Sequence, residues 1–261
     1  MKLGSCSANG TSQPCLVTPR GIVAIGDLAA SLRELIDNFD RLRARLEERL
    51  NTEPVKGATL LAPIRPGKIL CSTNVYAAQG EAPPLLMTLK SSESVAEQIV
   101  LPDTFEPWDF FPEAELGIVV KGRAKQLSAN DWRQAVFGYT CVVDVMARGG
   151  DTMFGRDYWV AKSDTLCPIG PWITTLDEVA DPNALRVQSW QNGFPAQSYS
   201  TVDAQYTLGQ QLEFITSVMT LYTGDVLACG TDPEGALPLQ AGDHVEVEIE
   251  ALGRLSVRVA A

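Results

Sequence analysis

Short runs of Val, Ile and Leu recur between glycine and proline turns from residue 61 to the end of the chain. They read KILC, ELGIVV, YTCVVDVM, PWITT, GDVLACG, HVEVEIE and LSVRV. The run at residues 244–250 alternates between polar and apolar side chains, which is typical of a half-buried strand. Repeated short strands separated by turn residues predict an α+β fold that is mostly β, with a roll-like main domain.

The first 60 residues have a different pattern. Residues 1–14 are rich in Ser, Gly and Asn, and we expect them to be poorly ordered. LVTP, a Pro-Arg-Gly turn and GIVAIG predict a short hairpin. Residues 28–50 carry Leu, Ile and Phe at helical spacing, which predicts one amphipathic helix with Asp27 as its cap.

These patterns divide the chain into two parts. We expect a small N-terminal α/β region, a hairpin plus a helix, over residues 1–60, and a main domain over residues 61–261. In the main domain, helical patterns are few. The best cover residues 129–135, opened by Ser128, and the stretch around 210–219.

The charge balance restricts the partners of the protein. Lys and Arg total 21 and Asp and Glu total 32, so the formal net charge is −11. This balance argues against broad nucleic-acid binding and against an anionic membrane surface. No stretch approaches the roughly 18–20 apolar residues of a membrane span, and the start, MKLGSCSANG, lacks the apolar run of a signal peptide. We therefore expect a cytoplasmic protein with neither a nucleic-acid nor a membrane partner.

A single histidine, His244, limits the catalytic chemistry. It lies on the Glu-bearing face of its predicted strand, which we interpret as the solvent side. A Ser-His-Asp or Cys-His arrangement is therefore not expected, nor is a metal site with several histidines. The six cysteines form no metal-type pair, and we expect them to be reduced and to pack as small apolar side chains.

Three acidic residues stand in apolar surroundings. Glu113 and Glu115 lie two apart on a predicted strand, so their side chains leave the same face. Asp144 interrupts another apolar run. A buried carboxylate costs several kcal/mol unless it is paired or bound to metal, and these runs contain no obvious matching cation. The pattern indicates a hard divalent ion, Mg²⁺, Mn²⁺ or Ca²⁺; the alternative is a surface-facing Glu pair.

From about residue 61 to residue 258 the chain resembles the fumarylacetoacetate hydrolase family. The matching pieces are LAPIRPGKILC, a modified NVYAAQGE, PLLMTLKSS, PEAELGIVVKG, GYTCVVDVMAR, Lys162 and Asp164 before CPIGPWITT, QNG with Gln197, GDVLACGT and LQAGDHVEVEIEALGRL. The resemblance implies a mixed β-sandwich roll, a catalytic Mg²⁺ (or Mn²⁺) held by Glu113, Glu115 and Asp144, and a homodimer. It also implies substrates with 1,3-dicarbonyl or 2-oxo-acid groups.

The resemblance also assigns roles to cationic residues. Lys162 is implied to hold a substrate carboxylate or a developing enolate; its alternative is a surface lysine paired with Asp164. Arg148 follows the metal aspartate of the family and either holds the carboxylates of the site or forms a structural ion pair. Lys90 is a further candidate contact for a substrate carboxylate.

Three uncharged positions complete the implied substrate site. Gly230 and Thr231 match the Gly-Thr turn of the family, where a backbone N–H and a hydroxyl can contact a substrate carboxylate. The alternative is a simple turn. Gln197 matches a polar position on the substrate side.

One departure from the family concerns a lid, which we expect from about Asn74 to Gln98. Hydrolytic relatives carry N-Y-x-x-H-x-x-E there, with a His–Glu pair that activates water. In this chain Glu81 falls on the family glutamate, but Ala78 stands at the histidine position. Glu81 and Lys162 therefore remain as the candidate catalytic residues.

The sequence thus predicts a metal-dependent enzyme that acts on a C–C bond of a 1,3-dicarbonyl or 2-oxo acid through a metal-stabilised enolate, as a hydrolase or decarboxylase. Two alternatives stay open. One is an isomerase or tautomerase of a specialised pathway, and the other is a catalytically inactive relative that binds a ligand.

Overall fold

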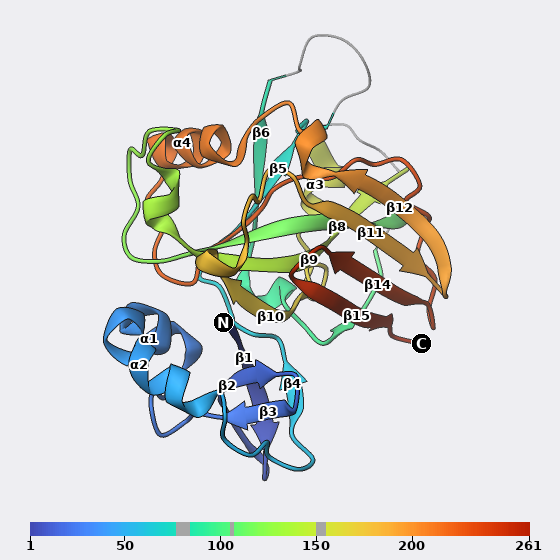
Figure 1. Cartoon of the computed structure of the whole chain (residues 1–261). Helices are drawn as coiled ribbons and strands as arrows, with labels where there is room; N and C mark the ends of the chain where they lie inside the picture. The colour runs from blue at the N-terminus through green and yellow to red at the C-terminus, as the bar shows by residue number, and fades with distance from the viewer. Residues whose placement is uncertain (77–83, 105–106, 150–154) are drawn as a thin grey trace.

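The computed structural model describes residues 1–76, 84–104, 107–149 and 155–261. Within these residues the chain forms two sheets (Figure 1). The larger sheet runs, in spatial order, through β3 (Gly21–Ala24), β2 (Thr11–Thr18), β1 (Lys2–Ala8), β10 (Ile169–Thr175), β9 (Val136–Arg148), β8 (Asp109–Val120), β13 (Val226–Ala228), β5 (Ile69–Thr73) and β6 (Leu86–Lys90), and β4 (Thr59–Leu61) pairs with β1. The smaller sheet runs through β12 (Phe194–Ser200), β11 (Arg186–Gln191), β14 (His244–Ile249), β15 (Gly253–Val259) and β7 (Gln98–Ile99). The expected mostly β fold of the α+β class is confirmed.

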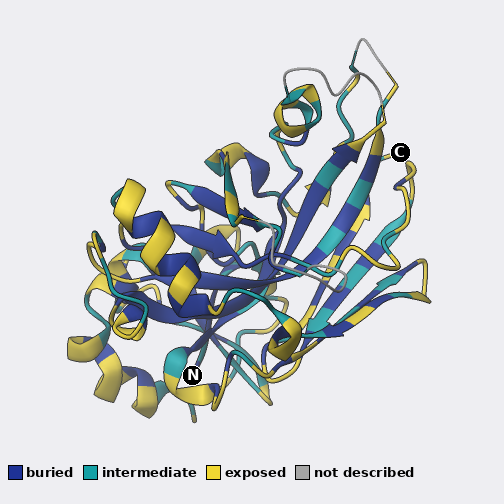
Figure 2. Cartoon of the chain, turned by 90° about the horizontal axis from the view of Figure 1, so that it is seen from above, coloured by how far each residue is buried: buried dark blue, intermediate teal, exposed yellow. Residues whose placement is uncertain are grey.

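The helices are short and lie at the outside of the sheets, with exposed outer faces (Figure 2). The α-helices are α1 (Leu32–Asp37), α2 (Phe39–Arg49), α3 (Arg156–Val160) and α4 (Leu208–Val218). The 3-10 turns are η1 (Ser92–Ser94), η2 (Trp132–Ala135), η4 (Leu176–Glu178) and η5 (Thr201–Asp203). No helix in the described parts of the chain is long and apolar enough to cross a membrane.

The antiparallel pair of β8 and β9 forms the centre of the fold. One face of the pair packs against the smaller sheet, in a core that includes Leu116, Val143 and Val247. The other face joins the core of the N-terminal helices. Since successive residues of a strand alternate between faces, the odd-numbered Glu113 and Glu115 leave β8 on the side away from the smaller sheet.

The N-terminal residues are ordered, which corrects one expectation. Residues 1–14 lie mostly in β1 and β2, and β1 lies inside the larger sheet between β2 and β10. The apolar members of this stretch decide the outcome, because Leu3, Cys6 and Ala8 are buried. The expected hairpin is present, with Thr18 paired to Gly21. The division near residue 60 falls inside β4, which pairs with β1, so it is not a break in the sheet.

The prediction of one N-terminal helix over residues 28–50 was wrong in detail. In place of one helix capped by Asp27 there are two, and α1 begins after Ser31, whose hydroxyl accepts a hydrogen bond from the Glu34 N–H. The break falls at Asn38, whose side chain donates to the Glu34 carbonyl and so competes with the helical backbone. Asp27 pairs instead with Arg49.

The two helices expected in the main domain had different outcomes. The segment 129–135 forms only the 3-10 turn η2. The helix expected around 210–219 is confirmed as α4, which opens with a capping box of Thr207 and Gln210.

The expected lid is only partly described. Residues 86–90 form β6, which is paired along its length with β5, and residues 92–94 form η1. Ala78 and Glu81 lie outside the described residues. The described part of the expected lid is thus a paired strand and a 3-10 turn. The lid stays a prediction for the chain before β6.

Candidate active site

The three predicted metal ligands lie together. Glu113 on β8 is directly opposite Asp144 on β9 in the antiparallel register, and Glu115 follows on the same face of β8. We call Glu113, Glu115 and Asp144 the carboxylate trio. The trio lines a cavity of about 290 Å³. The other lining residues are Ser72, Thr73, Asn74, Tyr76, Met146, Ala147, Arg148, Asp157, Tyr158, Thr231 and Pro233.

Each carboxylate of the trio has one oxygen held by the protein. Glu113 Oε1 accepts a hydrogen bond from Arg148 Nη2 at 2.8 Å. Glu115 Oε2 accepts one from the Gly230 backbone N–H at 2.8 Å, and Asp144 Oδ1 pairs with the Lys90 ammonium. Among the described residues, no donor reaches the second oxygen of any of the three. In type and charge, three carboxylates on one cavity are the donor set that a hard divalent cation prefers. In the described residues, the group whose potential ligand atoms already lie within 4.8 Å of one another is Cys71, Asp144 and Cys167, so the trio would have to draw closer around a bound ion.

Two cations stand closer to the trio than the sequence indicated. Arg148 pairs with Glu113, and Lys90 is fully buried beside Asp144. The pair of Arg148 with Glu113 is one of the two roles expected for that arginine. Lys90 comes from β6, outside the apolar runs around the carboxylates, and its pair with Asp144 was not expected.

Lys90 has a different position from the one its predicted role requires. Its Nζ donates to the carbonyls of Val145 and Leu166, both at 2.9 Å, in addition to its pair with Asp144. Burial acts to lower the pKa of Lys90, but the charge and hydrogen bond of Asp144, together with Cys167 and Cys71, raise that pKa above its ordinary value. Since an ammonium has three donors, Lys90 is fully used in stabilising Asp144 and does not line the cavity.

Burial raises the pKa of the two glutamates. The pKa of Glu113 is raised to about 7 by burial and by the charge of Asp144, against the lowering effect of Arg148. Burial and the charges of Asp144 and Glu113 raise the pKa of Glu115 well above its ordinary value. Without metal, Glu113 and Glu115 therefore retain protons more readily near neutral pH, and a divalent cation would displace them.

Lys162 lies two residues beyond α3, with a buried ammonium. Its Nζ has no hydrogen-bond partner among the described residues. Burial lowers the pKa of Lys162, while the charge of Asp144 opposes that shift. The alternative pair with Asp164 is not formed in the described structure, and Asp164 is exposed. Lys162 is thus a desolvated cation close enough to the trio to interact with Asp144.

Gly230 and Gln197 act on other protein groups. The Gly230 N–H is already used by Glu115. Gln197 is buried; its carbonyl oxygen accepts from the Ala114 N–H at 2.9 Å, and its amide donates to the Thr231 hydroxyl at 2.9 Å. Of these three predicted contacts, Thr231 alone lines the cavity. Gln197 connects β8 to the turn that carries Thr231.

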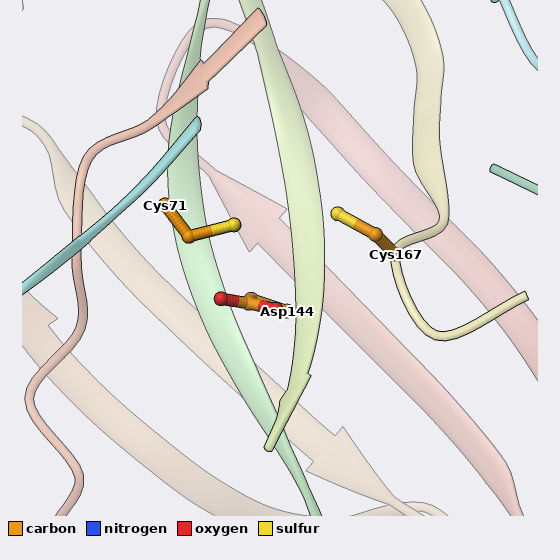
Figure 3. A group of neighbouring side chains, drawn as sticks. All are labelled: Cys71, Asp144 and Cys167. Carbon is orange, nitrogen blue, oxygen red and sulfur yellow. The ribbon is translucent and has the colours of Figure 1, made fainter. Parts of the chain in front are cut away.

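A second cluster lies behind the trio. Cys71 on β5 and Cys167 before β10 flank Asp144 (Figure 3), with potential ligand atoms within 4.8 Å of one another. A hydrogen bond to Cys167 and burial raise the pKa of the Cys71 thiol well above its ordinary value. Because Lys90 already pairs with Asp144 and Cys71 keeps its proton, we assign this cluster to packing around the ion pair.

Several cavity residues were not expected as site residues from the sequence, among them Asp157, Tyr158 and Tyr76. Asp157 and Tyr158 reach the cavity from α3, and Tyr76 reaches it from the end of β5. The Tyr76 ring packs edge-on against Tyr199, with ring centroids 4.9 Å apart. No periodicity marks a five-residue helix such as α3, so the sequence carried no signal for Asp157 and Tyr158. Tyr76 stands in the NVYAAQGE segment that resembles the family.

Comparisons with known proteins give the family that the sequence matches and the solved structures that the fold resembles. The family model of the fumarylacetoacetate (FAA) hydrolase C-terminal domain matches residues 71–260. The mitochondrial oxaloacetate tautomerase of Rattus norvegicus is 32% identical over 228 residues, which cover 81% of this chain and 72% of that protein.

Two solved structures are similar over the whole length. Maleylpyruvate hydrolase from Sphingobium sp. SYK-6 superposes with a TM-score of 0.88 at 29% identity, covering 100% of this chain and 99% of that one. The same enzyme in complex with manganese (II) ion and pyruvate gives a TM-score of 0.86 at 28% identity, covering the same shares of the two chains. Similar proteins therefore include both a tautomerase and a hydrolase.

Proposed function

This chain belongs to the fumarylacetoacetate hydrolase family, and from that premise we propose that it is an enzyme that binds Mg²⁺ or Mn²⁺ through the carboxylate trio and acts on a small 2-oxo acid. The observation that carries the proposal is the cavity on which Glu113, Glu115 and Asp144 each keep one oxygen free. The complex of a similar hydrolase with manganese and pyruvate supports both the ion and the substrate class.

The reaction we propose is keto–enol tautomerisation next to the keto group. Hydrolysis of a C–C bond needs an activated water, and an imidazole is the usual base near neutral pH. The single histidine of this chain, His244, lies on β14 with its ring against the Ser256 hydroxyl at 2.6 Å and does not line the cavity. Tautomerisation needs no nucleophilic water, and the rat relative is named for that reaction on oxaloacetate.

Each residue of the site has its own role in the proposed reaction. Glu113, Glu115 and Asp144 would hold the cation, which when bound would supply Lewis-acid polarisation of a keto group. Lys162 does not line the cavity, but its buried ammonium interacts with Asp144 and adds positive charge behind the trio, which favours negative charge on a bound substrate. Thr231 offers a hydroxyl to a substrate carboxylate, while Arg148 holds Glu113 in position. Gly230, Gln197 and Lys90 support the trio and Thr231 from behind.

C–C hydrolysis is the second candidate, because the similarity to maleylpyruvate hydrolase extends over the full chain. Glu81 would be its base. An inactive ligand-binding relative is the least supported alternative, since the trio and Lys162 are complete.

Assays of the purified, Mn²⁺-loaded protein separate these reactions. Loss of enol absorbance from oxaloacetate reports tautomerisation, pyruvate release from an acylpyruvate reports hydrolysis, and CO₂ release reports decarboxylation. We expect tautomerisation in the wild type and none above the free-metal background in Asp144→Asn, with Asp164→Asn as an exposed control. Cleavage of the acylpyruvate with no effect on oxaloacetate would favour hydrolysis instead. Inactivity in all three assays with Mn²⁺ bound would indicate a binding protein.

A further inference from the structure

Asp157 is a carboxylate on the cavity wall that the predicted metal site does not use. It projects from α3, a different element from the strands that carry the trio. Its Oδ1 is shielded from solvent and has no hydrogen-bond partner among the described residues. A polar oxygen that is buried without a partner lowers stability, so such atoms tend to have a function.

The other charged side chains that line the cavity are either paired with another residue or proposed to bind the cation. Glu113, Glu115 and Asp144 present their free oxygens to the cation, and Arg148 is paired with Glu113. Lys162 is a cation and does not line the cavity. Among the described lining residues, Asp157 is therefore the carboxylate left for proton transfer.

We propose that Asp157 is a catalytic residue, the base and acid that moves the proton of the substrate; this role rests on the proposed tautomerisation. The C–H bond next to the keto group breaks, and its proton passes to a carboxylate oxygen of Asp157. The electron pair of that bond forms the C=C bond, while the π pair of the keto group moves onto its oxygen. Asp157 then returns the proton to that oxygen, which gives the enol with no atom gained or lost.

The variant Asp157→Asn tests this role, because the amide keeps the size of the side chain and cannot take up the proton. Asp164→Asn is the matched control, since Asp164 is an exposed aspartate on the segment that follows the same helix. For Asp157→Asn we expect kcat for oxaloacetate to fall by about 10²–10⁴-fold, the usual contribution of a general base. KM and Mn²⁺ affinity by calorimetry should stay within about twofold, and Asp157→Glu should recover part of the rate. Asp164→Asn should match the wild type.

Exchange of the oxaloacetate C3 protons with D₂O, followed by NMR, measures the proton step directly and should slow by the same factor. Three results would overturn the assignment: exchange and kcat unchanged in Asp157→Asn, loss of Mn²⁺ affinity in parallel with kcat, or a comparable kcat loss in Tyr158→Phe, its neighbour on the cavity wall. An active wild type with an equally active Asp157→Asn overturns only the role of Asp157. A wild type that neither tautomerises oxaloacetate nor exchanges its protons overturns the proposed function itself.

Discussion

At the scale of single residues, the site is an arrangement of buried charges that nearly balance. Like charges that lie close together raise one another's pKa when they are carboxylates, and Arg148 reduces this effect at Glu113. Lys90 pairs with Asp144. Among the described residues, Glu115 accepts a hydrogen bond from the Gly230 N–H and has no cationic partner. It is therefore the member of the trio whose charge most depends on a bound cation.

Glu115→Gln is expected to weaken Mn²⁺ binding while the protein remains folded. The amide keeps the shape of the side chain and removes an anionic ligand, so the loss should exceed the roughly 10–100-fold that removal of an outer-shell partner costs. Calorimetric titration with Mn²⁺ measures it. Glu48→Gln, an exposed glutamate on α2, is the control and should bind as the wild type does. Equal affinity in the two variants would exclude Glu115 as a ligand.

Lys162→Met is expected to lower turnover and leave stability intact. Its ammonium is buried without a described partner, so its removal relieves desolvation, whereas loss of one preorganised charge contact costs on the order of 10² in rate. Thermal unfolding and kcat measured on the same preparation separate the two effects. The exposed Lys56→Met serves as the control. A large drop in Tm with normal turnover would show that Lys162 is structural.

At the scale of elements, the pairing of β8 with β9 and the turn after β13 set the geometry of the trio. The register places Glu113 opposite Asp144. The turn at Gly230 directs a backbone N–H to Glu115 from a third strand. Gly230 has φ +84°, and a Cβ there would lie 2.7 Å from the Val75 Cβ. A side chain at this position would push the turn away from Glu115.

Gly230→Ala is therefore expected to lower both stability and metal affinity. Gly122→Ala is the matched control, because Gly122 also has positive φ (+66°) but faces open space. The control should lose about 1 kcal/mol for the left-handed backbone, and Gly230→Ala should lose a further ~1–3 kcal/mol from overpacking. Denaturant unfolding measures stability and calorimetry measures Mn²⁺ affinity. If both variants behave alike, the close approach of Val75 to Gly230 has no role.

At the scale of the whole molecule, the buried trio links folding to pH and to metal. The pKa of Glu113 is raised from its ordinary 4.5 to about 7 in the folded protein. Below pH 4.5 the carboxyl is protonated in both the folded and the unfolded state. As the pH rises through 7 the folded state must ionise a buried group, so the stability associated with this proton is lost.

The metal-free protein should consequently have a lower Tm at about pH 8 than at about pH 5, and the increase in Tm caused by Mn²⁺ should be larger at the higher pH. Scanning calorimetry with and without Mn²⁺ measures both. Glu113→Gln is the control, since an amide does not titrate, and its metal-free Tm should fall less between the two pH values. A fall as large as that of the wild type would assign the pH dependence to other groups.

The edge strand β6 is the surface we propose for the homodimer that the family resemblance implies. Leu86 and Leu89 on this strand are 47% and 49% exposed, and an unpaired strand edge favours pairing with another chain. Light scattering should give twice the chain mass for the wild type and a smaller value for Leu89→Lys. Val202→Lys, which changes an exposed apolar residue elsewhere, should leave the mass unchanged. A monomeric wild type would exclude the dimer.

Part of the site could be predicted from the sequence because it depends on residues that are neighbours along the chain. Two glutamates separated by one residue on a strand must share a face, and an apolar run around Asp144 indicates burial wherever that strand lies. The recurring strand pattern also predicted the fold class. The same local reasoning failed at residues 1–14, where composition indicated disorder although buried Leu3 and Cys6 belong to the main sheet, and at Asn38, where one side-chain hydrogen bond divides a helix.

The sequence by itself determined that this chain is mostly β, that Glu113, Glu115 and Asp144 stand in apolar strand-like runs, and that the chain holds a single histidine. Only the tertiary structure decided which groups meet. Lys90 lies 54 positions from Asp144 along the chain, and Gly230 lies 115 positions from Glu115, and Asp157 reaches the cavity from a helix of five residues. Such contacts depend on how strands that are distant in sequence pair and pack, and no periodicity within one segment records them.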